Sequence, residues 1–255
     1  MKAPRTILIT GATGGIGQAL ALEYASPGYR LILQGRRSGT LAELAAACEA
    51  RGARVLTQAL DLRDAQALAR WLVPLAEAEA LDLVIVNAGL NASIGPDGRG
   101  ESAGEARALI EVNLLAAMAT VDAVLPAMRR RGRGQIALMS SLAAYFGLPV
   151  TPTYCATKAA LKAYGEALRG WLVAEGVEVN VVMPGYVESP MCEAMPGPKP
   201  FLWSAARAAR AIRHGLARNQ ARISFPFPLN LGSWFLAVLP AGVSQRILGW
   251  LGYGR

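Results

Sequence analysis

The segment that decides the fold is Thr6-Ile-Leu-Ile-Thr-Gly-Ala-Thr-Gly-Gly-Ile-Gly17. It opens with a short apolar run rich in β-branched residues, which predicts a buried strand. Four glycines follow, and the residues from Gln18 to Ala25 predict a helix. Glycines in such a turn let the backbone approach a pyrophosphate, whose charge is met by N–H groups at the helix start. The segment therefore favours a nucleotide-binding turn, although glycine-rich turns also serve packing alone.

The alternation of strand and helix continues along the chain. Further apolar runs predict strands at Leu31–Gln34, Arg54–Ala59, Leu83–Asn87, Gln135–Ser140, Val177–Met183 and Ala221–Phe225. Helical stretches rich in Ala and Leu lie near residues 40–50, 64–78, 103–131, 154–174 and 204–218. Strands that are apolar on both sides and alternate with helices imply a parallel sheet covered on both faces. We expect an α/β fold with one doubly wound sheet of about seven strands.

Length and composition agree with a single domain. The chain has 255 residues, of which 53% are hydrophobic and 17% charged, so it can bury one large core. No second domain, repeat or low-complexity linker is evident. We expect residues 1–225 to form the nucleotide-binding catalytic domain, and residues 226–255 to form an apolar C-terminal extension of it.

The histidine and cysteine content excludes several classes of site. His214 is the one histidine, which argues against histidine-based zinc sites and against a Ser-His-Asp hydrolase unless His214 is itself the base. Cys48, Cys155 and Cys192 show no C-x-x-C spacing and follow no secretory signal. We therefore expect no metal site and no disulfide framework, in a protein of a reducing, cytoplasmic compartment.

A tyrosine and a lysine mark the chemistry. Tyr154 and Lys158 are four residues apart on a predicted helix, so both side chains project from one face. A nearby ammonium stabilises a phenolate and brings the tyrosine pKa toward the working range. Ser141 stands at the end of a predicted strand, where active-site groups of open α/β sheets collect. Alone, a Y-x-x-x-K spacing is usually a surface pair; here the serine and the glycine turn accompany it.

With these signals together, the sequence resembles the short-chain dehydrogenase/reductase family over about residues 5–225. The family's T-G-x-x-x-G-x-G motif, its N-A-G motif and the Pro-Gly loop after its sixth strand are matched by Thr10, Gly11, Gly15, Gly17, Asn87, Ala88, Gly89, Pro184 and Gly185. Ser140-Ser-Leu-Ala-Ala and Tyr154-Cys-Ala-Thr-Lys resemble its S-S-x-A-G and Y-x-A-S-K segments. Thr157 replaces a common Ser and Ala144 a common Gly, and neither change removes a reacting group.

The resemblance implies a Rossmann-type oxidoreductase that interconverts a carbonyl and a secondary alcohol. Tyr154 would transfer the proton, Lys158 would assist it and hold the nicotinamide ribose, and Ser141 would hydrogen-bond the carbonyl oxygen. Asn113 would hold a water in the proton relay, and Asp61 would contact adenine. The cofactor-binding set implied is Gly11, Thr13, Gly15, Ile16, Gly17, Arg36, Arg37, Asp61, Asn87, Ala88, Gly89, Tyr154, Lys158, Pro184, Gly185 and Ser189. The alternative is a non-enzymatic NADP-binding scaffold or sensor that retains the fold.

The end of the second predicted strand bears on the choice of cofactor. Gln34-Gly-Arg-Arg37 contains no acidic residue to accept hydrogen bonds from a ribose 2′-hydroxyl. Its two guanidinium groups suit a 2′-phosphate, so NADP(H) is favoured and NAD(H) is the alternative. The competing interpretation is a pair of solvent-facing arginines on a loop.

The C-terminal quarter differs in charge and polarity from the rest. Residues 194–255 hold eight Lys or Arg and no acid, which accounts for the whole net charge of +8. Residues 223–245 carry no charge, but three prolines leave only about 229–239 as uninterrupted helix, too short to cross a bilayer. The tail is then a lid over the substrate, a subunit interface, or a contact with a membrane surface.

Partners follow from these alternatives. We expect a small carbonyl or alcohol substrate, lipid-like if the membrane hypothesis holds, and a homodimer or homotetramer. The location expected is cytoplasmic, with a peripheral contact on the inner face of a membrane as the further hypothesis. No aromatic and basic platform of the kind that binds nucleic acid is evident.

Overall fold

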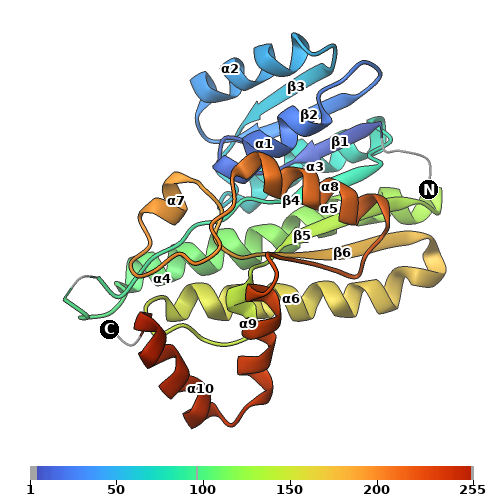
Figure 1. Ribbon diagram of the computed structural model, residues 1–255. Helices are drawn as coiled ribbons and strands as arrows, with labels where there is room; N and C mark the ends of the chain where they lie inside the picture. The colour runs from blue at the N-terminus through green and yellow to red at the C-terminus, as the bar shows by residue number, and fades with distance from the viewer. Residues whose placement is uncertain (1–4, 96, 254–255) are drawn as a thin grey trace.

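The computed structural model describes residues 5–95 and 97–253. One parallel sheet of seven strands has the order β3-β2-β1-β4-β5-β6-β7 (Figure 1). The strands are β1 Thr6–Ile9, β2 Arg30–Gly35, β3 Arg54–Ala59, β4 Leu83–Val86, β5 Gly134–Met139, β6 Val177–Pro184 and β7 Arg222–Phe225. All seven strands predicted from the sequence are confirmed, and so is the α/β doubly wound fold.

The strand order reverses between β1 and β4. From β1 the chain moves outward through β2 to β3, then returns to β4 on the other side of β1 and continues outward to β7. The connections after β1 and β4 therefore diverge, which leaves a crevice at the carboxyl ends of these two strands. The glycine segment after β1 and the Asn87-Ala-Gly89 segment after β4 both begin there.

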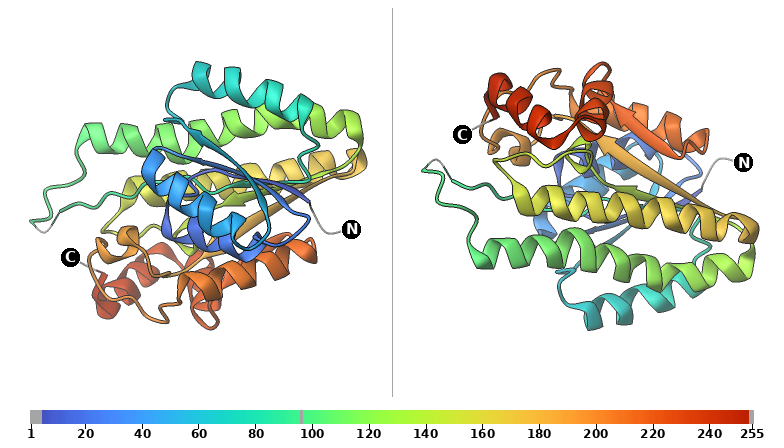
Figure 2. Two further views of the ribbon diagram at one scale, coloured as in Figure 1. Left: turned by 90° about the horizontal axis from the view of Figure 1, so that it is seen from above. Right: turned by 90° about the horizontal axis from the view of Figure 1, so that it is seen from below.

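Helices cover both faces of the sheet (Figure 2). On one face, α1 Gly15–Tyr24, α2 Ser38–Glu49 and α8 Ala205–Ala217 contribute to a core with β1 and β2. On the other face lie α3 Ala65–Ala78, α5 Ala116–Arg131 and α6 Pro152–Leu172. β4 and β5 are buried along their whole length because both of their faces are covered.

The predicted helix over residues 103–131 is interrupted. It consists of α4 Ala103–Ile110, a π-helical turn η1 Glu111–Leu115, and α5. By length and apolar composition alone this 29-residue stretch could cross a membrane. In the fold it is a layer of the core: Val121, Val124 and Met128 are fully buried against the sheet.

The chain after β6 forms a cover at the carboxyl end of the sheet. It includes the short α7 Pro190–Glu193, and after β7 the helices α9 Leu229–Val238 and α10 Ala241–Leu248, and the turn η4 Gly249–Tyr253. α9 and α10 make an antiparallel hairpin (red, Figure 1) beside the 3-10 turn η2 Leu142–Ala144, which follows β5. The uninterrupted helix predicted for the tail is confirmed, whereas α10 was not foreseen.

Candidate active site

Three glycines shape the turn between β1 and α1. Gly11 has φ +62°, and a Cβ there would lie 2.6 Å from the Cα of Ala88. A Cβ on Gly17 would lie 2.3 Å from the carbonyl oxygen of Gly11, and one on Gly15 would lie 2.7 Å from the Cβ of Ser189. Any larger residue would therefore displace the backbone at each position.

The start of α1 is available to an anion. Its N-cap residue, Gly14, offers no side chain to satisfy the first N–H groups, and the first turn contains no acidic residue. The free N–H groups and the helix dipole together favour a phosphate at this position. This geometry fits the pyrophosphate of a dinucleotide.

Asn87 braces the glycine turn. Its backbone N–H donates to Thr10 Oγ1 over 3.0 Å, and its side-chain amide donates to the carbonyl oxygens of Thr10 and Gly11, each over 3.1 Å. These bonds join the ends of β1 and β4 across the crevice. Asn87 therefore holds the shape of the turn besides lining the space beside it.

Two residues at the end of β2 define the floor of the crevice. Gln34 is 1% exposed; its Oε1 accepts from the N–H of Gly11 and its Nε2 donates to the carbonyl oxygen of Leu60. A Cβ on Gly35 would lie 2.8 Å from Thr13 Cγ2. Neither position brings a carboxylate toward a bound ribose.

Arg36 and Arg37 follow at the rim. Both are exposed and line the same cavity, and Arg37 donates from Nη2 to the carbonyl oxygen of Thr13 over 2.6 Å. Arg37 is therefore oriented by the glycine segment, in contrast to the competing interpretation of two arginines that only face solvent. Their charges are available to an anionic group beside the β2 end.

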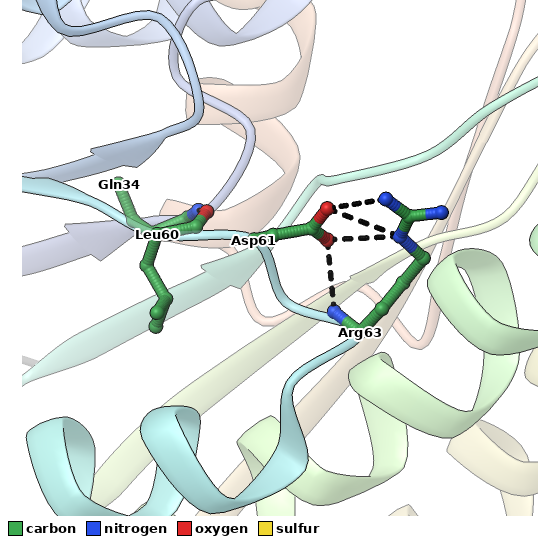
Figure 3. A network of polar contacts seen from close by, with 4 residues as sticks. All are labelled: Gln34, Leu60, Asp61 and Arg63. Atoms are coloured by element: carbon green, nitrogen blue, oxygen red, sulfur yellow. Dashed lines mark hydrogen bonds and ion pairs between the residues drawn. The ribbon is translucent and has the colours of Figure 1, made fainter.

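Asp61 closes this side of the crevice. Its carboxylate accepts hydrogen bonds from the backbone N–H, Nε and Nη2 of Arg63, the last over 2.6 Å (Figure 3). The hydrogen bonds from Arg63, with Arg36 nearby, hold the pKa of Asp61 below its usual range. The ion pair fixes the strand-end turn, and Asp61 still lines the cavity.

Tyr154 and Lys158 project from α6 beneath the end of β5. Lys158 is 4% exposed, and its ammonium donates to the carbonyl oxygen of Met139 over 2.7 Å. It lies 5.6 Å from the centre of the Tyr154 ring. Ser141 lies two residues after the last residue of β5, and its hydroxyl accepts a hydrogen bond from the N–H of Ala143 over 3.2 Å. The four-residue spacing thus delivers the predicted Tyr–Lys pair to one cavity.

Burial dominates the ionisation of this pair. It raises the pKa of Tyr154 to about 12, an effect that a hydrogen bond with Ser141 partly offsets. It lowers the pKa of Lys158 to about 8. Desolvation of the phenolate is the largest cause of the Tyr154 shift, so its direction is opposite to the lowering that a neighbouring ammonium would produce. The phenol is therefore protonated at neutral pH.

Asn113 lies behind the cavity wall. It sits in the π-helical turn η1 and is fully buried. Its side chain accepts from the N–H of Leu90 over 2.7 Å and donates to the carbonyl oxygen of Leu90 and to Thr157 Oγ1. A Cβ on Gly89 would lie 3.4 Å from Asn113 Oδ1 and 3.5 Å from Lys158 Nζ, so Gly89 keeps the space between these two groups open.

One cavity of about 1100 Å³ joins these elements. It contains every cofactor and catalytic residue predicted from the sequence except Asn113, which adjoins it. Beyond Tyr154 the cavity continues into an apolar compartment that no sequence motif predicted. That compartment is lined from η2, the loop before α6, the loop around α7, and the C-terminal hairpin, by Leu142, Phe146, Leu148, Met191, Met195, Leu229, Leu236, Ile247 and Leu248.

Hydrogen bonds of two tyrosines join the segments that enclose this compartment. The Tyr186 and Tyr253 hydroxyls are 2.9 Å apart, and Tyr253 donates to the carbonyl oxygen of Pro198 over 2.8 Å. Tyr253 is 6% exposed and joins the last turn, η4, to the segment around α7. Tyr186 follows the Pro184-Gly185 motif directly, which could have drawn attention to it, whereas Tyr253 had no sequence signal.

The family model for short chain dehydrogenases matches residues 5–198. The chain belongs to the short-chain dehydrogenase/reductase family. An uncharacterized oxidoreductase of Myxococcus xanthus is 38% identical over 241 residues, 92% of this chain and 93% of that protein. A very-long-chain 3-oxoacyl-CoA reductase of Phaeosphaeria nodorum is 32% identical over 241 residues, 90% of this chain and 70% of that protein.

Solved structures agree in fold. A short-chain dehydrogenase from Sphingobium yanoikuyae, in complex with NADPH, has a TM-score of 0.80 at 25% identity and covers 96% of this chain and 95% of its own. The resemblance inferred from the glycine, N-A-G and Ser-Tyr-Lys motifs is confirmed. So is its consequence that the protein is an oxidoreductase enzyme acting on a CH–OH or C=O group.

Proposed function

We propose that this short-chain dehydrogenase/reductase is an NADP(H)-dependent enzyme that reduces the carbonyl group of a large apolar substrate, or oxidises the corresponding alcohol. The observation that carries the proposal is the single cavity that runs from the glycine turn past Tyr154 into the apolar compartment. Such a cavity would hold the cofactor at the glycine turn and the substrate in the apolar compartment. No observation favours the alternative of a non-enzymatic scaffold.

The cofactor would lie along the crevice between β1 and β4. Gly11, Gly15 and Gly17 would admit its pyrophosphate, and Arg36 and Arg37 would meet a 2′-phosphate, so NADP(H) is the favoured form and NAD(H) the alternative. The NADPH bound in the Sphingobium relative supports this choice. When bound, the cofactor supplies or accepts the hydride at the substrate carbon.

Tyr154 is the proton donor of the proposed reduction. The phenol is protonated at neutral pH and gives its proton to the carbonyl oxygen as the C–H bond forms. Ser141, beside it, donates a hydrogen bond to the same oxygen. In the oxidation the proton moves from the alcohol back to the Tyr154 oxygen.

Lys158 and Asn113 complete the proposed set. The buried ammonium of Lys158 would bind the ribose of the cofactor and favour release of the Tyr154 proton once the reaction begins. Asn113 would position a water near Lys158, in the space that Gly89 keeps open, and so return a proton to the tyrosine. Both residues act beside Tyr154, so neither is expected to set substrate preference.

The apolar compartment supports a hydrophobic substrate. Its lining beyond the catalytic residues consists mostly of Leu, Met, Ile, Phe and Pro side chains, which would bind an alkyl chain or ring system by desolvation. The similarity to a very-long-chain 3-oxoacyl-CoA reductase points in the same direction. Homo-oligomer formation stays a prediction.

The test is a direct one. Purified enzyme would be assayed at 340 nm, roughly the NADPH absorption maximum, with a series of ketones of increasing chain length and with the matching alcohols and NADP⁺. We expect kcat/KM to rise with chain length and to be higher with NADPH than with NADH. A panel without turnover, or a preference for short polar carbonyls, would contradict the proposal.

A further inference from the structure

Helix α9 is apolar on two opposite faces. Leu229, Gly232, Ser233 and Leu236 line the cavity. Leu231, Trp234, Phe235 and Val238 lie on the other side, 52%, 43%, 52% and 56% exposed. Both sets follow the spacing i, i+3, i+4, i+7 of a helix face. A helix that is apolar all round normally has protein or lipid on every side, yet none of the ten residues of this fully described helix is buried.

The rest of the hairpin also exposes large apolar side chains. Val243 on α10 is 41% exposed and Trp250 on η4 is 84% exposed. Together with the four outward residues of α9 they form what we call the C-terminal apolar face: Leu231, Trp234, Phe235, Val238, Val243 and Trp250. Ser244 donates to the carbonyl oxygen of Leu236 over 2.8 Å and holds α10 against α9, so the face is carried by one unit.

The cavity reaches the surface at this same unit. Leu251 lines the cavity and is also 56% exposed, and Gly232 likewise lines it from an exposed position. The hairpin rests on the catalytic turn, because Leu229 packs within 2.9 Å of where a Cβ on Gly185 would be, beside Leu142. The exposed positions of Gly232 and Leu251 therefore place an opening of the Tyr154 cavity on the same hairpin as the C-terminal apolar face.

The hairpin, residues 229–253, carries one charged residue, which is basic. Residues 194–255 contain eight basic residues and no acid. Arg246 lies on α10 and is exposed, whereas Lys199, next to Pro198, is partly buried and donates to the carbonyl oxygen of Met195 over 2.9 Å. By contrast, α8 directs Ala208, Ile212 and Leu216 into the core, and its Arg213 pairs with Glu23 at 3.3 Å. The hairpin, rather than α8, carries the unpartnered apolar surface.

We propose that the C-terminal apolar face inserts into the surface of an anionic membrane and that apolar substrates enter the catalytic cavity from the bilayer through the hairpin. The inference rests on the proposed function for its substrate but not for its membrane contact. A helix of ten residues is about 15 Å long, half of the hydrocarbon thickness, so α9 lies in the interface and does not cross it. Tryptophans at such depth are typical of membrane interfaces.

The experiment is co-sedimentation of the full chain with vesicles. Phosphatidylcholine vesicles containing phosphatidylglycerol would be compared with vesicles of phosphatidylcholine alone, at low and high salt. We expect binding to the anionic vesicles, weaker binding at high salt, and a blue shift of tryptophan fluorescence from Trp234 and Trp250. Changing Leu231, Phe235 and Trp250 together to Ser should weaken vesicle binding at least about tenfold.

Matched variants keep the outcome interpretable. Trp171→Ser removes another exposed tryptophan, 57% exposed on α6, and should leave vesicle binding unchanged. Trp250→Ser alone, at the most exposed position of the face, removes little packing and should still weaken binding. A water-soluble ketone with NADPH reports the fold of every variant, because none of the altered residues lines the cavity.

Two results would overturn the inference. The first is a full chain that ignores anionic vesicles, or whose binding the triple substitution does not alter. The second is a chain that does not bind vesicles and whose triple substitution converts a dimer to a monomer, as measured by light scattering. That result would make the face a contact with a second copy. Turnover of the water-soluble ketone tests the proposed function separately, so vesicle binding without turnover would contradict that function and leave the membrane contact standing.

Discussion

The crevice between β1 and β4 and the C-terminal hairpin line the same cavity, but they are built differently. In the crevice, close backbone packing at Gly11 and Gly17 and side-chain hydrogen bonds from Asn87 and Gln34 hold each group in place. The hairpin contributes apolar side chains, few polar bonds, and a helix, α9, without a buried residue. Reaction chemistry needs fixed donors and acceptors, whereas recognition of an apolar chain needs only desolvated surface.

This difference separates the expected effects of mutation. Changes in the crevice should impair every substrate alike, because every substrate uses the same hydride and proton transfers. Changes in the hairpin should depend on substrate size.

Tyr154→Phe should lower kcat by about 10²- to 10⁴-fold, equally for short and long ketones, because the proton donor alone is removed. NADPH affinity, measured by fluorescence titration, should stay within about twofold. Tyr164→Phe, on the same helix but outside the cavity, is the matched control and should keep full activity. A Tyr154 variant with wild-type turnover would remove the proposed role.

Lys158→Met should lose activity and gain stability. The pKa of Lys158, lowered by burial from 10.5 to about 8, means that its charge costs about 3 kcal/mol in the folded state at neutral pH. The variant should therefore unfold at a higher denaturant concentration. Its free energy of unfolding should rise by up to that amount, reduced by the contribution of the lost hydrogen bond to Met139. Its kcat/KM with NADPH should fall by about 10²-fold.

The sign of the pH dependence follows from linkage. Between the folded pKa near 8 and the ordinary value of 10.5, the unfolded chain binds more protons at Lys158 than the folded one. Wild-type stability relative to the variant should therefore rise with pH across this window. Denaturant titrations of both proteins at several pH values measure the difference in their free energies of unfolding. A difference that stays constant with pH would contradict a buried charge at Lys158.

Changing Arg36 and Arg37 to Ala should raise the KM for NADPH by roughly 10- to 100-fold, since charge-assisted hydrogen bonds to a phosphate contribute about 1.5–3 kcal/mol. The KM for NADH should change by less than about twofold. Arg70→Ala, an exposed arginine on α3, controls for net charge. Equal losses with both cofactors would show that these arginines support the glycine segment and do not select NADP(H).

Tyr253→Phe should give the smallest effect and the one that depends on the substrate. It removes the hydrogen bonds to Tyr186 and Pro198 while keeping the ring, at a cost of about 1–2 kcal/mol in stability. The KM for long ketones should rise by roughly 2- to 10-fold, with kcat for short ketones unchanged. A double-mutant cycle with Tyr186→Phe measures the coupling. An equal loss of kcat for every substrate would contradict the expectation that changes in the hairpin depend on substrate size.

Much of the crevice could be predicted from sequence because its determinants are local. A β-branched run followed by glycines at fixed intervals has few other structural outcomes, and Tyr154 and Lys158 share a face of α6 through helix geometry alone. Ser141 was placed correctly because strand ends meet at one edge of a parallel sheet. The absence of a carboxylate at the end of β2 is likewise visible in the sequence.

Other features depend on contacts between distant segments. Asn113 lies in a π-helical turn and its amide pairs with Leu90, 23 residues earlier, and no periodic pattern encodes that bond. The direction of the Tyr154 pKa shift could not be predicted from the sequence, since the sequence shows a neighbouring ammonium but not the burial that raises this pKa.

Residue type and short-range spacing are enough to predict the sheet, the glycine turn, the Ser-Tyr-Lys constellation and the C-terminal concentration of positive charge. The arrangement of the apolar residues in the uncharged tail depends instead on tertiary packing. Large apolar residues lie on opposite sides of α9, and it is the packing against Leu142 and Gly185 that turns Leu229 and Leu236 toward the cavity and leaves Leu231 and Phe235 outside.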